Sequence, residues 1–205
     1  QRYGDKGIDL FHGHAKFTGK HSLDVGGQAV EAKYVLIASG AEPVKLNIPG
    51  EEYLINNEGF LSLEALPKRI VVVGGGFIAA EFSHIAARAG ASVTVVEGGA
   101  SILQAFDAEL VGWLMEKFQV LGIDIRTRTS VQAVEKIDNG YRVHASTDGT
   151  KISVDADLVV HAAGRVPALA SLNLQAAGIA TSNGRLELND YLQSVTNPVV
   201  YAAGD

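Results

Sequence analysis

The chain has 205 residues, of which 47% are hydrophobic, and a formal net charge of −6 at pH 7. The acidic balance argues against nucleic acid as a partner, and no apolar run is long enough to cross a bilayer. Without any cysteine, these residues hold no disulfide, thiolate metal site or redox dithiol. No signal peptide is recognisable, which favours a cytoplasmic protein, and the ends at Gln1 and Asp205 favour a segment of a longer one.

The first part of the chain has the pattern of short strands joined by turns. Apolar stretches at residues 8–11, 15–17 and 34–37 are separated by glycines, which is typical of a β-meander. Residues 39–43 then break the pattern, and Pro49 and Gly50 mark a further turn.

The most informative pattern is an apolar run, 70–73, that leads directly into a glycine-rich turn. Four β-branched residues in a row predict a parallel strand buried on both faces, and residues 77–89 predict a helix after the turn. A strand, a Gly-x-Gly-x-x-Ala turn and a helix N-terminus form a site for the pyrophosphate of a dinucleotide. Its residues are Gly74, Gly75, Gly76, Phe77, Ile78 and Ala79.

An acidic residue, Glu97, ends the next predicted strand, 91–96. A carboxylate at this position accepts hydrogen bonds from the adenosine ribose of the dinucleotide. A 2′-phosphate within about 4 Å of it would be repelled by on the order of 1–4 kcal/mol. No basic residue lies between Gly98 and Phe106 to offset that repulsion, so we predict NAD(H) rather than NADP(H).

The remaining elements predict a second helix and more strands. Asp107 is a good N-cap for a helix that ends near Gly122, and a third parallel strand is expected at 123–125. Three alternating segments follow around Asn-Gly and Asp-Gly turns and predict an antiparallel meander, after which a buried strand returns. Those segments are 131–137, 141–146 and 152–154, and the returning strand is 158–160. The fold class is therefore α/β, with a Rossmann-like parallel sheet and an antiparallel β-meander.

Four motifs in order make the chain similar to the flavin-dependent pyridine nucleotide–disulfide oxidoreductases. In chain order they are residues 35–40, the glycine turn at 74–79, residues 161–167 and residues 196–205. The resemblance implies a discontinuous FAD domain whose pieces flank an NAD(H)-binding domain. Its boundaries would be 1–42 for the first FAD segment, 43–166 for the NAD(H) domain and 167–205 for the returning FAD segment.

The same resemblance implies roles for individual residues. Phe77 matches an aromatic that covers the flavin until nicotinamide displaces it, or else is an ordinary apolar residue of a helix start. Glu81 matches a carboxylate near the nicotinamide, or else serves the helix dipole. Further NAD contacts are implied for Val131 and Gly164. The implied FAD contacts are Ala15, Ser39, Gly40, Arg165 and Asp205, with an interface salt bridge as the alternative for Arg165.

In such a family the full-length protein is a homodimer that transfers hydride between NADH and FAD. The redox cysteines and the dimerisation domain would lie outside these residues, so we expect this chain to bind NAD(H) without turnover and to hold no catalytic residue. No metal site is predicted, because His12 and His14 have no third ligand. Glu97 favours the branch typified by dihydrolipoamide dehydrogenase, but glutathione-like, mercuric and other acceptors stay open. The alternatives are an NADH oxidase or ferredoxin-type reductase of the same plan, and a non-catalytic NAD-binding module.

Overall fold

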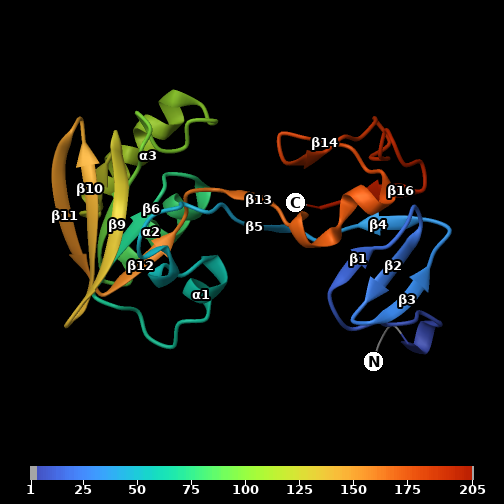
Figure 1. Cartoon of the computed structure of the whole chain (residues 1–205). Helices are drawn as coiled ribbons and strands as arrows, with labels where there is room; N and C mark the ends of the chain where they lie inside the picture. Colours follow the sequence, from blue (N-terminus) through green and yellow to red (C-terminus); the bar gives the residue numbers. More distant parts are fainter. Residues whose placement is uncertain (1–3, 205) are drawn as a thin grey trace. The chain divides into compact units, whose positions relative to one another are not determined.

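The computed structural model describes residues 4–204 and contains two compact units. One unit is formed by Gln1–Glu42 together with Val166–Asp205, and the other by Pro43–Arg165. The chain leaves the first unit through β5 (Ala41–Pro43) and returns through β13 (Arg165–Pro167), and these two strands form a small sheet (Figure 1).

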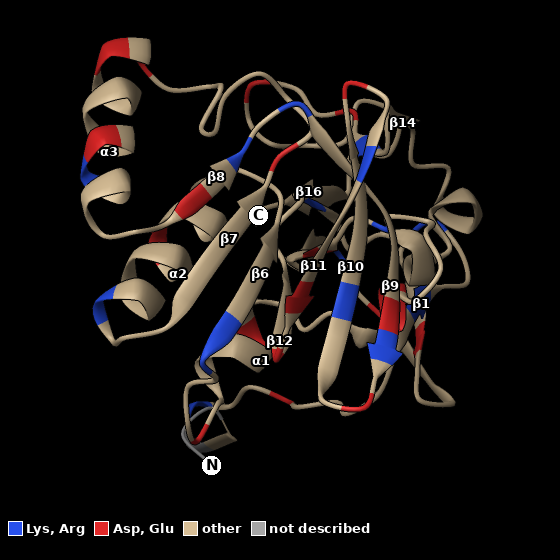
Figure 2. Ribbon diagram, turned by 90° about the vertical axis from the view of Figure 1, so that its left-hand side faces the viewer, with Lys and Arg blue, Asp and Glu red and all other residues tan. Residues whose placement is uncertain are grey.

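The Pro43–Arg165 unit is built on a four-stranded parallel sheet with the order β12-β6-β7-β8. Figure 2 shows these strands side by side, with β7 free of charged residues. Buried strands of this kind need apolar residues on both faces, which is why the sequence shows continuous runs rather than alternation. The strands are β6 (Arg69–Val73), β7 (Ser92–Val96), β8 (Asp124–Arg126) and β12 (Leu158–His161). The predicted parallel strands are therefore confirmed.

Three α-helices belong to this unit: α1 (Asn57–Leu61), α2 (Phe77–Arg88) and α3 (Ala108–Val120), preceded by the 3₁₀ turn η2 (Glu51–Tyr53). Asp107 caps α3 as predicted, because its side chain accepts hydrogen bonds from the N–H groups of Glu109 and Leu110 at 3.0 and 3.2 Å. Within residues 4–204, every helix is too short or too polar to span a membrane.

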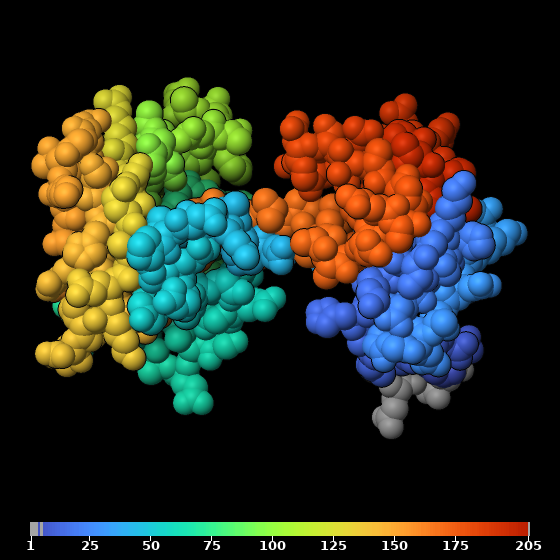
Figure 3. Space-filling view, viewed as in Figure 1, coloured from blue at the N-terminus to red at the C-terminus, as the bar shows by residue number. Residues whose placement is uncertain are grey.

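The predicted antiparallel meander is also confirmed. It consists of β9 (Thr129–Ile137), β10 (Gly140–Thr147) and β11 (Thr150–Ala156), paired in the order β11-β10-β9. In the space-filling view these residues, coloured yellow to orange, form one outer side of the unit (Figure 3).

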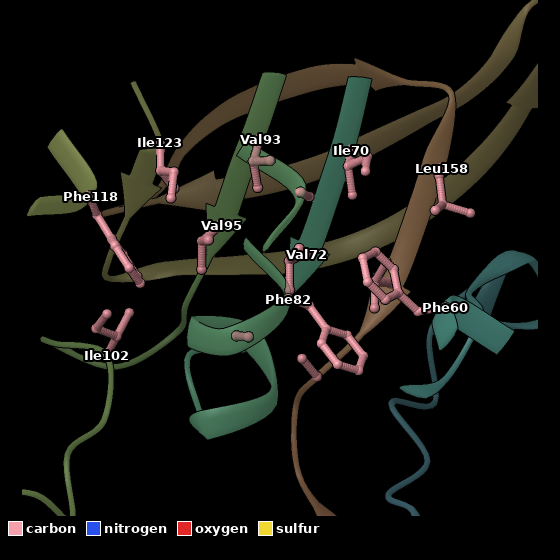
Figure 4. Packing of buried hydrophobic residues seen from close by; sticks show 14 of the residues in the cluster. Phe60, Ile70, Val72, Phe82, Val93, Val95, Ile102, Phe118, Ile123 and Leu158 are labelled. Atoms are coloured by element: carbon pink, nitrogen blue, oxygen red, sulfur yellow. The ribbon is translucent and has the colours of Figure 1, made fainter. Parts of the chain in front are cut away.

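Alternate residues of β6 pack into two different clusters. Ile70 and Val72 belong to the cluster that α2 and α3 complete, whereas Val71 and Val73 pack with residues of the meander. Figure 4 shows the helix-side cluster, in which the rings of Phe60 and Phe82 are stacked with centroids 4.3 Å apart. The unit thus has three layers, with helices on one face of the parallel sheet and the meander on the other.

The other unit has a smaller core made of residues from both of its chain segments, among them Phe17, Ile37, Ala177 and Val200. A three-stranded antiparallel sheet contains β1 (Ala15–Phe17), β2 (Ser22–Val25) and β3 (Gln28–Glu31). Strands β4 (Val35–Ile37) and β16 (Val200–Ala202) form a parallel pair. The remaining elements are β14 (Thr181–Ser182), β15 (Arg185–Leu186) and the 3₁₀ turns η1 (Gly4–Lys6), η3 (Ala170–Leu172) and η4 (Leu174–Ala177).

The prediction of a short strand at residues 8–11 is wrong. In the described part of the chain this stretch has no strand partner, and the exposed fractions of Ile8, Leu10 and Phe11 are 48%, 51% and 43%. An apolar run becomes a strand only where another segment supplies the hydrogen bonds of a ladder.

Candidate dinucleotide site

The glycine turn lies at the carboxyl end of β6 and is held tightly by its neighbours. Gly74 is buried and has φ of +106°, a conformation that favours glycine. Its N–H donates to the carbonyl of Val96 at 2.8 Å. A Cβ at this position would lie 2.3 Å from the carbonyl oxygen of Ala162 and 2.5 Å from Cα of Ala163. Gly74 is therefore required by the fold itself, because the chain that leaves β12 packs directly against it.

Gly75 brings the turn into contact with Glu97. A Cβ on Gly75 would lie 2.8 Å from Oε2 of Glu97, and 3.0 Å from Cγ2 of Ile102. The other carboxylate oxygen, Oε1, accepts a hydrogen bond from the N–H of Gly99 at 2.5 Å. Glu97 thus lies against the glycine turn, half-buried and held in one orientation.

Gly76 is different, because nothing in the protein requires it to be glycine. It is the N-cap residue of α2 with φ of −77° and ψ of −172°, which any residue adopts. The nearest atom to a Cβ placed there is the carbonyl oxygen of Ala162, at 3.9 Å. Open space therefore lies directly before the helix.

The N-terminus of α2 has no side-chain cap, whereas Asn56 caps α1 and Asp107 caps α3. The first N–H groups of a helix have no partner within the helix, and the dipole makes this end positive. Together with the space at Gly76, this end of α2 suits a phosphate group.

Some of the residues that follow the turn are buried in the core, and others are exposed. Ala79 is 1% exposed and allows α2 to approach the sheet, while Ile78 is half-buried. The ring of Phe77 is 57% exposed, and Glu81 is exposed one turn later. The ring of Phe77 is not part of the core, so core packing does not account for an aromatic residue at this position. The proposed role of Phe77 as a gate stays a prediction.

A loop that the sequence did not single out closes one side of the site. Ile102 is 2% exposed, and the N–H of Leu103 donates to the carbonyl of Gly75 at 2.7 Å. Leu103 has φ of +51°, which is unusual for a leucine and is maintained by these contacts. The local pattern of this loop carries no signal of its contact with the turn.

Two other residues with implied NAD roles have packing or backbone partners of their own. Val131 is in β9, pairs with Ala145 and packs into the meander-side cluster. Gly164 follows β12, has φ of +108°, and its carbonyl accepts from the N–H of Val44 at 3.1 Å. None of these partners is Gly75 or Glu97. The NAD roles of Val131 and Gly164 stay predictions.

Arg165 and His161 have partners in the same unit. The guanidinium of Arg165 donates from Nη1 to Oδ1 of Asn57 at 2.9 Å. His161 is 7% exposed, and its Nε2 lies 2.8 Å from the carbonyl oxygen of Val44. Within the described residues, no group of three His, Cys, Asp or Glu could hold a metal ion.

Two of the implied FAD residues lie at one edge of the parallel pair in the other unit. Ser39 and Gly40 follow β4, and the N–H of Ala203, just after β16, donates to the carbonyl of Ile37 at 3.0 Å. The carboxyl edge of parallel strands is where nucleotides bind in α/β folds. Ala15 lies apart, in β1 of the three-stranded sheet, and Asp205 lies outside the described residues.

Two arginine–aspartate ion pairs lie away from the glycine turn, and that of Arg69 is at the opposite end of β6. The side chain of Arg69 donates to Oδ1 of Asp157, and Arg142 donates to both carboxylate oxygens of Asp155. The arginine hydrogen bonds hold the pKa of each aspartate below its usual range. These pairs join strand ends and leave the dinucleotide site unaffected.

Comparison with known proteins relates the whole chain to one group. The family model described as "Pyridine nucleotide-disulphide oxidoreductase" matches residues 1–205. The chain is 33% identical to a mercuric reductase of Bacillus cereus over 204 residues, covering 98% of this chain and 32% of that protein. It is 33% identical to a glutathione reductase of Schizosaccharomyces pombe over 207 residues, covering 97% of this chain and 44% of that protein.

A solved structure agrees with the fold. The HOCl-induced flavoprotein disulfide reductase RclA from Escherichia coli superposes with a TM-score of 0.86 at 28% identity, covering 97% of this chain and 46% of that one. The chain therefore spans between about a third and just under half of the length of these proteins.

Proposed function

The chain belongs to the pyridine nucleotide-disulphide oxidoreductase family, and on this premise we propose that it is the NAD(H)-binding portion of a flavin-dependent disulfide oxidoreductase resembling dihydrolipoamide dehydrogenase. NAD(H) and FAD would supply hydride chemistry, and the chain would supply binding and orientation. The full-length protein would be a cytoplasmic homodimer in which these residues act together with the remainder of the polypeptide.

The observation that carries the proposal is the contact between Glu97 and the glycine turn. Oε2 of Glu97 lies 2.8 Å from the point where a Cβ of Gly75 would be, and open space lies over the adjacent Gly76. A carboxylate for the ribose and an uncapped helix N-terminus for the pyrophosphate are thus next to each other. Their adjacency supports the proposal that one dinucleotide binds to both groups.

In this proposal each part of the Pro43–Arg165 unit has a task. Gly74 shapes the turn, the N–H groups at the start of α2 bind the pyrophosphate, and Glu97 accepts the ribose hydroxyls. Phe77 and Glu81, on the exposed side of α2, would lie toward the nicotinamide. Val131 and Gly164 would complete the NAD contacts.

The other unit is proposed to be part of an FAD domain. Ser39 and Gly40 at the carboxyl edge of β4 would contact the flavin nucleotide there, with Asp205 following β16. Ala15 and Arg165 would provide the remaining contacts from this chain.

Binding measurements with a Glu97→Ala variant test the proposal. Loss of charge-assisted hydrogen bonds to the ribose should weaken NADH binding by about 1–3 kcal/mol, or roughly 5- to 150-fold in Kd, measured by calorimetry. Glu116→Ala is the matched control, because it removes the same charge from the exposed surface of α3 and should leave the NADH Kd within about twofold. An unchanged Kd for Glu97→Ala would refute the ribose assignment.

A further inference from the structure

A cavity of about 420 Å³ lies within the Pro43–Arg165 unit and plays no part in the proposed dinucleotide site. None of the described residues that line it belongs to the glycine turn or to the loop at Ile102, and Glu97 is not among them. Its volume is in the range of protein cavities that hold small organic ligands, which combine apolar walls with a few polar groups. The apolar residues here are Pro43, Leu54 and Ile55, and the polar ones are Glu51, Asn56 and His161.

His161 is a buried polar residue of this cavity whose ring is only partly hydrogen-bonded. It ends β12, is 7% exposed, and has its Nε2 2.8 Å from the carbonyl oxygen of Val44. Because a carbonyl oxygen only accepts, Nε2 carries the proton, and Nδ1 of the neutral ring is then an acceptor. In residues 4–204, Oγ of Ser83 is the only fully buried side-chain nitrogen or oxygen without a partner. Nδ1 of His161, which has no partner among these residues, therefore reaches the cavity wall and is open to a ligand.

Glu51 gives the cavity a fixed negative charge. Its Oε1 accepts from the N–H of Leu46 at 2.8 Å and its Oε2 from the N–H of Asn47 at 2.9 Å, which hold the carboxylate in one position. Each carboxylate oxygen can accept a further hydrogen bond from a ligand. None of the described residues that line the cavity is Lys or Arg, so no basic side chain of the lining offsets this charge. The cavity therefore offers acceptors and a negative charge beside apolar walls.

We propose that this cavity is a binding site of its own, separate from that of the dinucleotide, for a small organic ammonium ion with an apolar body. The ammonium group would donate hydrogen bonds to the carboxylate of Glu51 and to Nδ1 of His161. The apolar body would lie against the walls at Pro43, Leu54 and Ile55. An anion of the same shape would be repelled by Glu51. The site would therefore select its ligand by positive charge, and it does not depend on the proposed function.

The test compares 2-phenylethylammonium with two compounds of similar shape, the neutral 2-phenylethanol and the anion phenylacetate, by ligand-detected NMR titration of the purified protein. The ammonium should bind about tenfold more tightly than the alcohol, and phenylacetate should show no measurable binding.

Three variants assign the binding to the cavity. Glu51→Gln should weaken binding of the ammonium about tenfold and of the alcohol by less than about threefold. Glu52→Gln is the matched control, because it removes the same charge from the next residue, which is exposed, and should change neither Kd by more than about twofold. His161→Phe keeps a ring but removes the acceptor, and should weaken binding of both compounds about threefold to tenfold.

The remaining outcomes also decide. Equal binding of the ammonium and the alcohol to the wild type, or an equal loss in Glu51→Gln and Glu52→Gln, would overturn the selection by charge. Displacement of the ammonium by saturating NADH would place it in the dinucleotide site and overturn a separate one. Urea unfolding shows whether each variant is folded, and if Glu51→Gln is not, unchanged binding to a folded His161→Phe would overturn the proposal. Failure of the wild type to bind NADH would refute the dinucleotide site but leave this one intact.

Discussion

Two glycines of the same turn should respond in opposite ways to replacement by alanine. At Gly74 the new Cβ would lie 2.3 Å from the carbonyl oxygen and 2.4 Å from the carbonyl carbon of Ala162, in a backbone with φ of +106°. Strained backbone costs about 1–2 kcal/mol and forced overlap about 1–3 kcal/mol, so Gly74→Ala should lower the free energy of unfolding by about 2–5 kcal/mol. At Gly76 the nearest atom to a new Cβ is 3.9 Å away and φ is −77°, so Gly76→Ala should change the free energy of unfolding by less than about 0.5 kcal/mol.

The replacement at Gly76, which should leave stability unchanged, should instead weaken dinucleotide binding. The methyl group of Gly76→Ala would occupy the space before α2 in which we place the pyrophosphate, and should weaken NADH binding by about 1–3 kcal/mol, or roughly 5- to 150-fold. Urea unfolding gives the stability and calorimetry the Kd. Gly112→Ala is the control, because Gly112 is an exposed residue within α3 with no atom within 4 Å of a new Cβ. It should stabilise the protein by about 0.5–1 kcal/mol without affecting binding. A Gly76→Ala variant that binds NADH as tightly as the wild type would refute our placement of the pyrophosphate.

Two further predictions concern stability. The hydroxyl of Ser83 in α2 is buried without a hydrogen-bond partner, so Ser83→Ala should raise the free energy of unfolding by about 1 kcal/mol in urea titrations. The control is Ser92→Ala at an exposed position, which should change the free energy of unfolding by less than about 0.5 kcal/mol. A destabilised Ser83→Ala variant would show that the hydroxyl has a hydrogen-bond partner. The pKa of Asp157 is lowered chiefly by the hydrogen bond from Arg69, so this pair stabilises the fold above the unfolded-state pKa of about 3.9, and the stabilisation is lost as pH falls through the lower folded-state value. The difference in stability between wild type and Asp157→Asn should accordingly shrink between pH 6 and pH 3, and a difference that stays constant would contradict this linkage.

Most of the secondary structure could be predicted because its signals are local. The apolar run at 70–73 indicated a strand buried on both faces, and β6 indeed contributes alternate side chains to two clusters. Asp107 as an N-cap and the turns at Asn139-Gly140 and Asp148-Gly149 marked the start of α3 and the hairpins of the meander. The strand expected at 8–11 does not form, because a strand also needs a pairing partner elsewhere in the chain, and the local sequence carries no information about that partner.

The candidate site could be predicted only in part. The sequence named the glycine turn and Glu97, but not that Ile102 and Leu103 would close against Gly75. It also suggested that no cation lies near Glu97, because the residues that follow it contain none. The structure adds that the backbone N–H of Arg128, in the turn after β8, donates to the carbonyl of Gly99 where β8 lies beside β7, and the preference for NAD(H) stays a prediction.

Composition, periodicity and turn residues by themselves determined that this chain is an α/β protein with a nucleotide-type turn between a buried strand and a helix. Only the tertiary structure decided which glycine serves the fold, which leaves room for a ligand, and which segments meet around Glu97. The physical reason is that backbone conformation depends on neighbours in the chain, whereas steric space and charge at a site depend on segments that meet only when the sheet is assembled.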